Sequence, residues 1–281
     1  MNFRDKAMLA RVSISMWSGR RHDKNATLEI ERAHNSENMG RFNKILVDQS
    51  LLKPIEQAAG ALRNAHYGFT LPWDDSDWRL LPAAQYFDAS TEVQRAESVF
   101  WQRVDAMLLE YEAEVERSRQ RLKDLWVASE YPRKDDLRAR YNVRWNVIPI
   151  PDAQDFRIDL GDQEIDAVRA QIEARVAEAT QTAVKGIYEQ MFVVVSKMHE
   201  RLSNPTATFR NSLTENIEKI CELVPKLNFT GDPKIAEFGE EIKRKLAIYA
   251  PETLRESTYA RQQTAENAAK IMDTMKEFMN G

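Results

Sequence analysis

The chain of 281 residues is long enough for one large domain or two smaller ones, each able to bury a core without disulfide bonds. Its formal net charge is −4, and its single cysteine, Cys221, excludes an intrachain disulfide and any CxxC zinc or redox site. No stretch approaches the roughly 20 consecutive apolar residues of a membrane-spanning helix, and the N-terminal residues lack the apolar core of a signal peptide. We therefore expect a cytoplasmic protein with no membrane partner.

The first predicted element is a half-buried strand over residues 7–17, where apolar and polar residues alternate with a period of two. Apolar residues between 42 and 62 then suggest two shorter helices with a break near residues 48–52. An irregular, aromatic-rich loop follows over residues 68–88. Helical spacing of apolar residues predicts one long amphipathic helix over residues 91–127.

A second alternating segment, residues 141–148, predicts a strand that ends before Pro149 and pairs with the N-terminal strand. Phe156, Ile158 and Leu160 form a candidate third strand. A helix over residues 163–203 comes next, with a predicted length of about 60 Å. Pro205, Pro233 and Pro251 are placed to open helices near 205–225, 233–249 and 251–279, because the first helical turn tolerates proline.

These elements predict a mainly α fold, in which long amphipathic helices form a helical bundle or a coiled-coil-like stalk. A small antiparallel sheet is expected from the N-terminal strand and the strand near 141–148. The boundary falls between an N-terminal α+β part, residues 1–155, and an all-helical C-terminal part, residues 156–281, although composition changes only gently there and the two also fit one domain.

The candidate binding site with most cationic donors follows the first strand and comprises Trp17, Arg20, Arg21 and Lys24 around a glycine. Such a turn suits a phosphate, which guanidinium groups and turn amides bind together. It is not a P-loop, because neither GxxxxGK[ST] nor GxGxxG occurs in the chain. A set of solvated turn charges is the interpretation that we favour, although this turn is the best candidate binding site in the chain.

A second candidate site lies in the aromatic loop, where Trp73 and Trp78 precede Arg79. An aromatic pair beside a guanidinium is able to stack on a base or a peptide side chain. The interpretation that we favour is that both tryptophans anchor the loop to the core. Between them, Asp74, Asp75 and Asp77 either hold a divalent cation or serve as ordinary turn residues, and we favour the turn.

The chain contains no HExxH, GxSxG or comparable catalytic pattern among its four histidines, its serines and its one cysteine. We therefore predict a protein that is not an enzyme, with no catalytic residues, no metal site and no cofactor. An unrecognised enzyme that uses the aspartates of the aromatic loop is the lowest-ranked alternative.

Several segments resemble an uncharacterised family of helical proteins, a domain of unknown function encoded mainly by bacteriophages. They include LARVSISMWSGRR at 9–21, GRFNKIL at 40–46, TLPW at 70–73, RLLP at 79–82, IPDAQDFR at 150–157 and CELVPKLN at 221–228. Genes of this family often lie near genes for a MoxR-like AAA+ ATPase and a von Willebrand factor A-type protein. The resemblance implies no activity or catalytic residues, but it implies a location in the host-cell cytoplasm and a role beside an ATPase.

The leading hypothesis is a non-enzymatic phage or prophage protein that acts through protein–protein interaction. The expected partner is a second copy of the chain, an AAA+ ATPase or a virion component. The alternative is a nucleic-acid-binding protein that uses the basic turn. Residues 1–70 carry a net charge of +4 and the remainder −8, and such a division suits either an acidic protein surface or phosphate.

Overall fold

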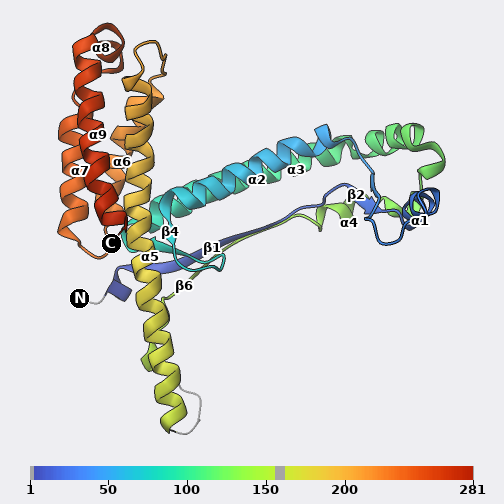
Figure 1. The fold of residues 1–281 in the computed structure, drawn as a ribbon. Coiled ribbons are helices and arrows are strands. Elements are labelled where there is room, and N and C mark those ends of the chain that lie inside the picture. The colour runs from blue at the N-terminus through green and yellow to red at the C-terminus, as the bar shows by residue number, and fades with distance from the viewer. Residues whose placement is uncertain (1–2, 156–161, 281) are drawn as a thin grey trace. The chain divides into compact units, whose positions relative to one another are not determined.

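The computed structural model describes residues 3–155 and 162–280 and confirms the expected mainly α fold with a small antiparallel sheet. The helices among these residues are α1 (Lys24–Ala33), α2 (Gln49–Phe69), α3 (Tyr86–Leu122), α4 (Lys134–Arg138), α5 (Asp162–Ser203), α6 (Ser212–Leu227), α7 (Pro233–Leu246), α8 (Pro251–Glu256) and α9 (Thr258–Asn280). The strands are β1 (Ala7–Ser15), β2 (Arg20–His22), β3 (Asn43–Ile45), β4 (Leu71–Pro72), β5 (Arg79–Pro82) and β6 (Asn142–Ile148) (Figure 1).

The chain divides into two compact units that alternate along the sequence. The first, which we call the bundle unit, consists of Met1–Arg11, Phe69–Asp88 and Asn146–Gly281. The second, the α2–α3 unit, consists of Val12–Gly68 and Ala89–Trp145. This division differs from the sequence-based boundary between residues 155 and 156, because Met1–Arg11 and Phe69–Asp88 share a unit with the C-terminal helices.

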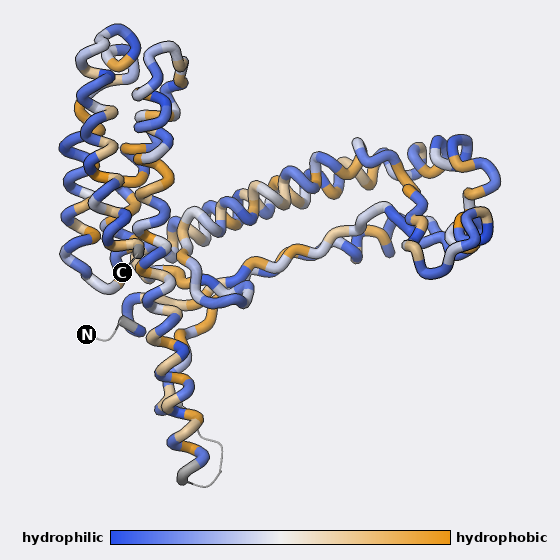
Figure 2. Tube along the Cα trace, in the orientation of Figure 1, coloured by the Kyte–Doolittle hydropathy of each residue, from blue (hydrophilic) through white to orange (hydrophobic). Residues whose placement is uncertain are grey.

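The core of the bundle unit forms around α5, which packs against α6, α7 and α9. Its buried residues recur every three or four positions, as the helical spacing predicts: Val176, Ala179, Ala183, Ile187, Met191, Val195, Met198 and Leu202. Figure 2 shows hydrophobic residues recurring among hydrophilic ones along these helices. Half-buried Cys221 lies beside this core, and burial raises the pKa of its thiol to about 11.

The sheet has the strand order β4-β5-β1-β6, so the predicted pairing of β1 with β6 is confirmed. In the bundle unit, β1 pairs antiparallel with β5, with Leu9 opposite Leu80. The short strand β4 packs against α5 at Gly186, where a Cβ atom would lie 2.7 Å from Pro72 Cδ. The bare glycine therefore allows this helix to approach the strand.

The α2–α3 unit has a separate core, in which α2 and α3 contribute most of the buried side chains. From α2 come Leu52, Ile55, Ala58, Ala59 and Leu62, and from α3 come Val93, Phe100, Val104, Met107, Leu108 and Tyr111. The two-stranded sheet of β2 and β3 also belongs to this unit. Each unit thus buries its own set of apolar residues.

Several predicted boundaries need correction. Only the middle of residues 68–88, residues 73–78, is irregular, because Leu71–Pro72 and Arg79–Pro82 form the antiparallel strands β4 and β5 and α3 begins at Tyr86. The two shorter helices are one helix, α2, preceded by strand β3. Helix α6 begins at Ser212 and not near residue 205 as predicted. The Asn204 carboxamide accepts a hydrogen bond from the Thr206 amide, but this contact closes a turn and does not start a helix. The last predicted helix is divided into α8 and α9 at Ser257, and the third strand lies outside the described residues.

Candidate binding surfaces

The predicted basic turn is strand β2 and the start of α1. Arg20, Arg21 and Lys24 are exposed, whereas Trp17 is 8% exposed and packs edge-on against Tyr111, with 6.0 Å between ring centroids. Because successive residues of a strand point to opposite faces, Arg20 and Arg21 do not share one face. The structure therefore places Trp17 in a core and distributes the three cations around β2.

The second predicted site also contributes to a core. Trp73 is 4% exposed, and half-buried Trp78 lies under the Arg11 guanidinium, 4.8 Å from the ring centroid. The Arg79 guanidinium donates to Thr70 Oγ1 at 2.8 Å and to the Thr70 carbonyl at 3.1 Å. These contacts hold the β4–β5 hairpin in place.

The aspartates between the two tryptophans behave as turn residues. Asp74 accepts from the Ser76 amide at 2.9 Å and forms an ion pair with Arg175 at 2.8 Å. Burial raises the pKa of Asp74, but the hydrogen bonds from Ser76 and Arg175 outweigh it and hold the pKa below its usual value. Asp75 and Asp77 are exposed.

Sequence reasoning missed a buried lysine in the α2–α3 unit. The side chain of Lys44, on β3, is 1% exposed, and its ammonium group lies 3.1 Å from Asp23 Oδ2 and 2.7 Å from Glu130 Oε2. It also donates to the Leu125 carbonyl at 2.7 Å. Burial alone would lower the pKa of Lys44, but the two carboxylates outweigh it and raise the pKa.

Helix α1 is attached to this lysine and to the β2–β3 sheet by polar contacts. Asp23, its N-cap, accepts from the Ala26 amide at 3.1 Å while also binding Lys44. The Thr27 hydroxyl accepts from the Phe42 amide at 3.0 Å. No residue of α1 is buried. A helix of this length is marginal in isolation, so the polar contacts carry most of its attachment.

Large apolar side chains are exposed on α1, on the loop after it and on β3. The exposed fractions are 47% for Leu28, 39% for Ile30, 57% for Met39, 37% for Phe42 and 42% for Ile45. We call residues 20–45 the head surface. All five lie within this one stretch of the chain, and exposed apolar side chains are typical of a binding surface where they form a contiguous patch.

Cations accompany these apolar residues. Lys24, Leu28 and Arg32 follow one another at intervals of four, so they share one face of α1. Arg20, Arg21 and Arg41 are also exposed on the head surface. None of these five cations forms an ion pair within the described part of the chain.

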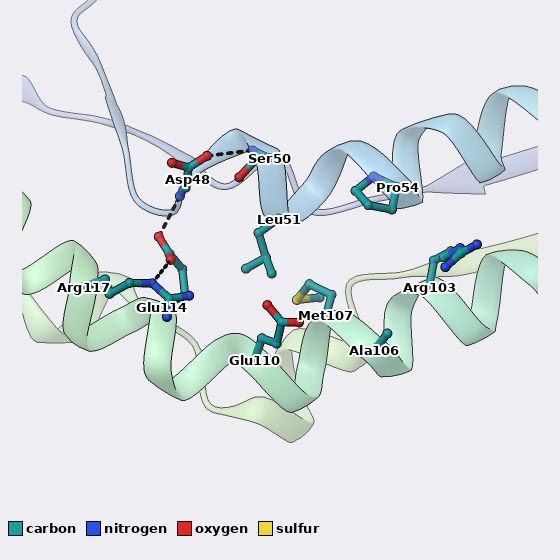
Figure 3. Close-up of a pocket in the computed structure, with 10 residues that line it drawn as sticks. All are labelled: Asp48, Ser50, Leu51, Pro54, Arg103, Ala106, Met107, Glu110, Glu114 and Arg117. Atoms are coloured by element: carbon teal, nitrogen blue, oxygen red, sulfur yellow. Dashed lines mark hydrogen bonds and ion pairs between the residues drawn. The ribbon is translucent and has the colours of Figure 1, made fainter.

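A cavity of about 350 Å³ lies between the first turns of α2 and the middle of α3 (Figure 3). Its lining combines apolar Leu51 and Met107 with the polar side chains of Glu110 and Arg103. At one end, Glu114 accepts from the Asp48 amide at 2.8 Å, from Arg117 at 2.8 Å and from Ser118 at 3.1 Å.

The contacts of Glu114 join the start of α2 to α3. Burial raises the pKa of Glu114, but these hydrogen bonds outweigh it and hold the pKa below its usual value. The carboxylate is therefore occupied by contacts within the chain, and we interpret its role as structural.

Comparison of the chain with protein-family models, with curated proteins and with solved structures finds no match. Within residues 3–155 and 162–280, no helix has both the length and the apolar character needed to cross a bilayer. The same residues include no group of three or more His, Cys, Asp or Glu side chains placed to hold a metal ion.

Proposed function

We propose that this protein is a non-enzymatic interaction protein that assembles with a second copy of itself through the head surface. The observation that carries the proposal is helix α1, which exposes Leu28 and Ile30 and buries no residue on its own chain. Burial of apolar area is the main source of free energy in protein association. A second chain that covers the head surface supplies this burial.

Charge complementarity favours a second copy as the occupant. The α2–α3 unit contains 19 Lys and Arg residues and 17 Asp and Glu residues, for a net charge of +2. The bundle unit contains 21 and 27, for a net charge of −6. The unpaired cations of one head surface therefore attract the acidic bundle unit of another copy, and this attraction weakens with salt.

The resemblance to a phage-encoded family extends the proposal to a larger assembly. In that setting the assembled protein acts as an adaptor of an AAA+ ATPase or as a component of a virion, in the cytoplasm of the host cell. Gene neighbourhood supports this part of the proposal by association.

The test is light scattering coupled to size-exclusion chromatography on the wild type and on the Leu28→Glu variant. We expect a discrete oligomer for the wild type and a shift toward monomer for Leu28→Glu, because a buried carboxylate opposes the interface. Leu109→Glu is the matched control, since Leu109 is 80% exposed on α3, outside the head surface. A monomeric wild type, or equal effects of the two variants, would refute the proposal.

Nucleic-acid binding is the second candidate, and the exposure of Arg20, Arg21 and Lys24 without ion pairs in the described chain favours it. Each phosphate contact contributes to a steep fall of affinity with salt. We would measure binding of single-stranded DNA to the wild type and to an Arg20→Gln/Arg21→Gln variant over a range of salt concentrations. Absence of binding at low salt eliminates this candidate, and a smaller salt slope for the variant supports it.

A further inference from the structure

A groove in the bundle unit has a lining rich in cations and lies apart from all the sites predicted from the sequence. It runs between the end of α5, residues 204–211 and the start of α6, and its volume is about 640 Å³. Lys197 and Arg201 come from α5, Arg210 from the connecting segment and Ser212 from α6. We call it the loop groove.

The connecting segment that forms one wall is held in place by Arg261 of α9. The Arg261 guanidinium donates to four backbone carbonyls, those of Arg201 at 2.8 Å, Leu202 at 3.1 Å, Asn204 at 2.6 Å and Ala207 at 2.8 Å. One side chain thus satisfies carbonyls at the end of α5 and fixes the path of the chain beyond it.

A second arginine fixes the other end of the segment. Arg255 donates to Asn211 Oδ1 and to the Phe209 carbonyl. The Phe209 ring lies 5.3 Å from the Arg255 guanidinium and 5.6 Å from that of Arg261, at cation–π distance from both. The groove wall is therefore formed before any ligand arrives, which lowers the entropy cost of binding.

The charges of the loop groove favour an anion. Lys197, Arg201 and Arg210 are exposed, and within the described residues none of them forms an ion pair. Lys197 and Arg201 are four residues apart and share one face of α5. Glu200 supplies the one carboxylate among the lining residues, so three cations and one anion leave a net charge of +2.

Hydroxyl groups complete the donor set. Thr208 and Ser212 line the same groove and are exposed. Guanidinium, ammonium and hydroxyl donors around a concave surface match the several acceptor oxygens of a phosphate group. Duplex nucleic acid fits less well, because the bundle unit as a whole carries a net charge of −6 and repels a long polyanion.

We propose that the loop groove binds a phosphate group, either as inorganic phosphate or as a small phosphate monoester, with Arg201 and Arg210 as the principal ligands and Lys197 as a further cation. This binding is independent of the head surface and of self-assembly. Phosphate occupancy links α5 to the segment before α6 and thereby stabilises the folded bundle unit.

The experiment is isothermal titration calorimetry of the full chain at low salt in a phosphate-free buffer, with inorganic phosphate and glycerol 3-phosphate as separate ligands. We expect saturable binding of at least one of them, and the two titrations identify which source of phosphate the groove prefers. Arg210→Gln should weaken binding about tenfold, the loss of roughly one charge-assisted contact. Glu200→Gln should strengthen binding, since it removes the repelling carboxylate.

Lys219→Gln is the matched control, because Lys219 is exposed on α6 and does not line the groove. Its affinity should stay within about twofold of the wild type, as expected for a distant exposed charge. Arg210, Glu200 and Lys219 are all exposed, and circular dichroism checks that each variant is folded. Absence of binding for both ligands, or an equal loss in Lys219→Gln and Arg210→Gln, would overturn the proposal.

Discussion

Burial removes the hydration of a charged lysine, so other polar atoms must replace the lost water. Three oxygen atoms do so around the ammonium group of Lys44. The ammonium group donates to the carboxylate of Asp23 and to the carbonyl of Leu125, and it forms an ion pair with the carboxylate of Glu130. Because Asp23 is also the N-cap of α1, the same ion pair links β3 to the helix of the head surface. Loss of the Lys44 charge would therefore destabilise both the core of the α2–α3 unit and the head surface.

Replacing Lys44 with Met should lower the free energy of unfolding by about 3 kcal/mol, because two partly buried carboxylates lose their cation. Urea unfolding at neutral pH measures the change. Lys53→Met is the control: Lys53 is exposed on α2, and its replacement should change stability by about 0.5 kcal/mol or less. Similar values for the two variants would show that the ion pair contributes little.

The buried carboxylate of Glu114 should make stability depend on acid. Since its pKa is held below the ordinary value of 4.5, its contribution is present above that pH and is lost as the pH falls through the folded-state pKa. Glu114→Gln should therefore show a shallower fall in unfolding free energy between about pH 6 and about pH 3.5. Urea unfolding at both pH values measures it, and exposed Glu116→Gln should retain the wild-type dependence.

Individual candidate residues were only partly predictable from the sequence. Trp17 and Trp73 were candidate binding residues, although anchoring was the favoured interpretation of Trp73, and burial places both in cores. Lys44 carried no local signal, because its partners lie about 20 and 85 residues away in the sequence. Residues of the loop groove come from α5 and α6 and from the segment between them, and only the fold shows that their charges line one cavity.

At the scale of elements, the spacing of apolar residues predicted the longer helices and strands, in which the pattern repeats several times. The long helices α3 and α5 and the strands β1 and β6 were found, because each displays its period over seven or more residues. Strands β2 to β5 were missed, since two to four residues cannot show an alternation. In β5 three consecutive residues are buried, which hides its period of two.

The packing of α5 on β4 predicts an unusual response to a helical substitution. Gly→Ala inside a helix normally stabilises by about 0.5–1 kcal/mol. Gly186→Ala should instead destabilise by about 1–3 kcal/mol, because its methyl group would overlap Pro72. Gly60→Ala, in α2 with open space around the added carbon, is the stabilising control. Thermal unfolding measures both, and stabilisation by Gly186→Ala would contradict the packing.

At the scale of the whole molecule, the two units are interleaved. The chain passes between them within β1, near the end of α2, near the start of α3 and within β6. Each of these crossings lies in or beside a helix or strand. Because each unit consists of separate segments of the chain, cleavage at a single position would release neither unit intact. The amino-acid composition did not reveal this division into units. Both units contain helices as well as strands, so composition does not change clearly where the chain crosses from one unit to the other.

A fragment of residues 1–155 should therefore retain the core of the α2–α3 unit but lose the helices that cover β1, β4 and β5. Leu9, Leu71 and Leu80, which are buried against the bundle, would become exposed. We expect the fragment to retain helical circular dichroism, to bind a hydrophobic dye and to associate. The full chain serves as the control. A monomeric fragment without dye binding would show that the N-terminal part is an autonomous domain.

The single thiol has a practical consequence for spectroscopy. At a pKa of about 11, Cys221 is almost entirely protonated at neutral pH, and the thiolate is the form that reacts with maleimides. Cysteines introduced at exposed positions should react much faster, so fluorophores or spin labels can be attached without first removing the native thiol. A variant with two introduced cysteines, one on the head surface and one beside the loop groove, could carry a probe at each site. The distance between the two probes on the intact chain would then show whether phosphate binding or self-assembly changes it.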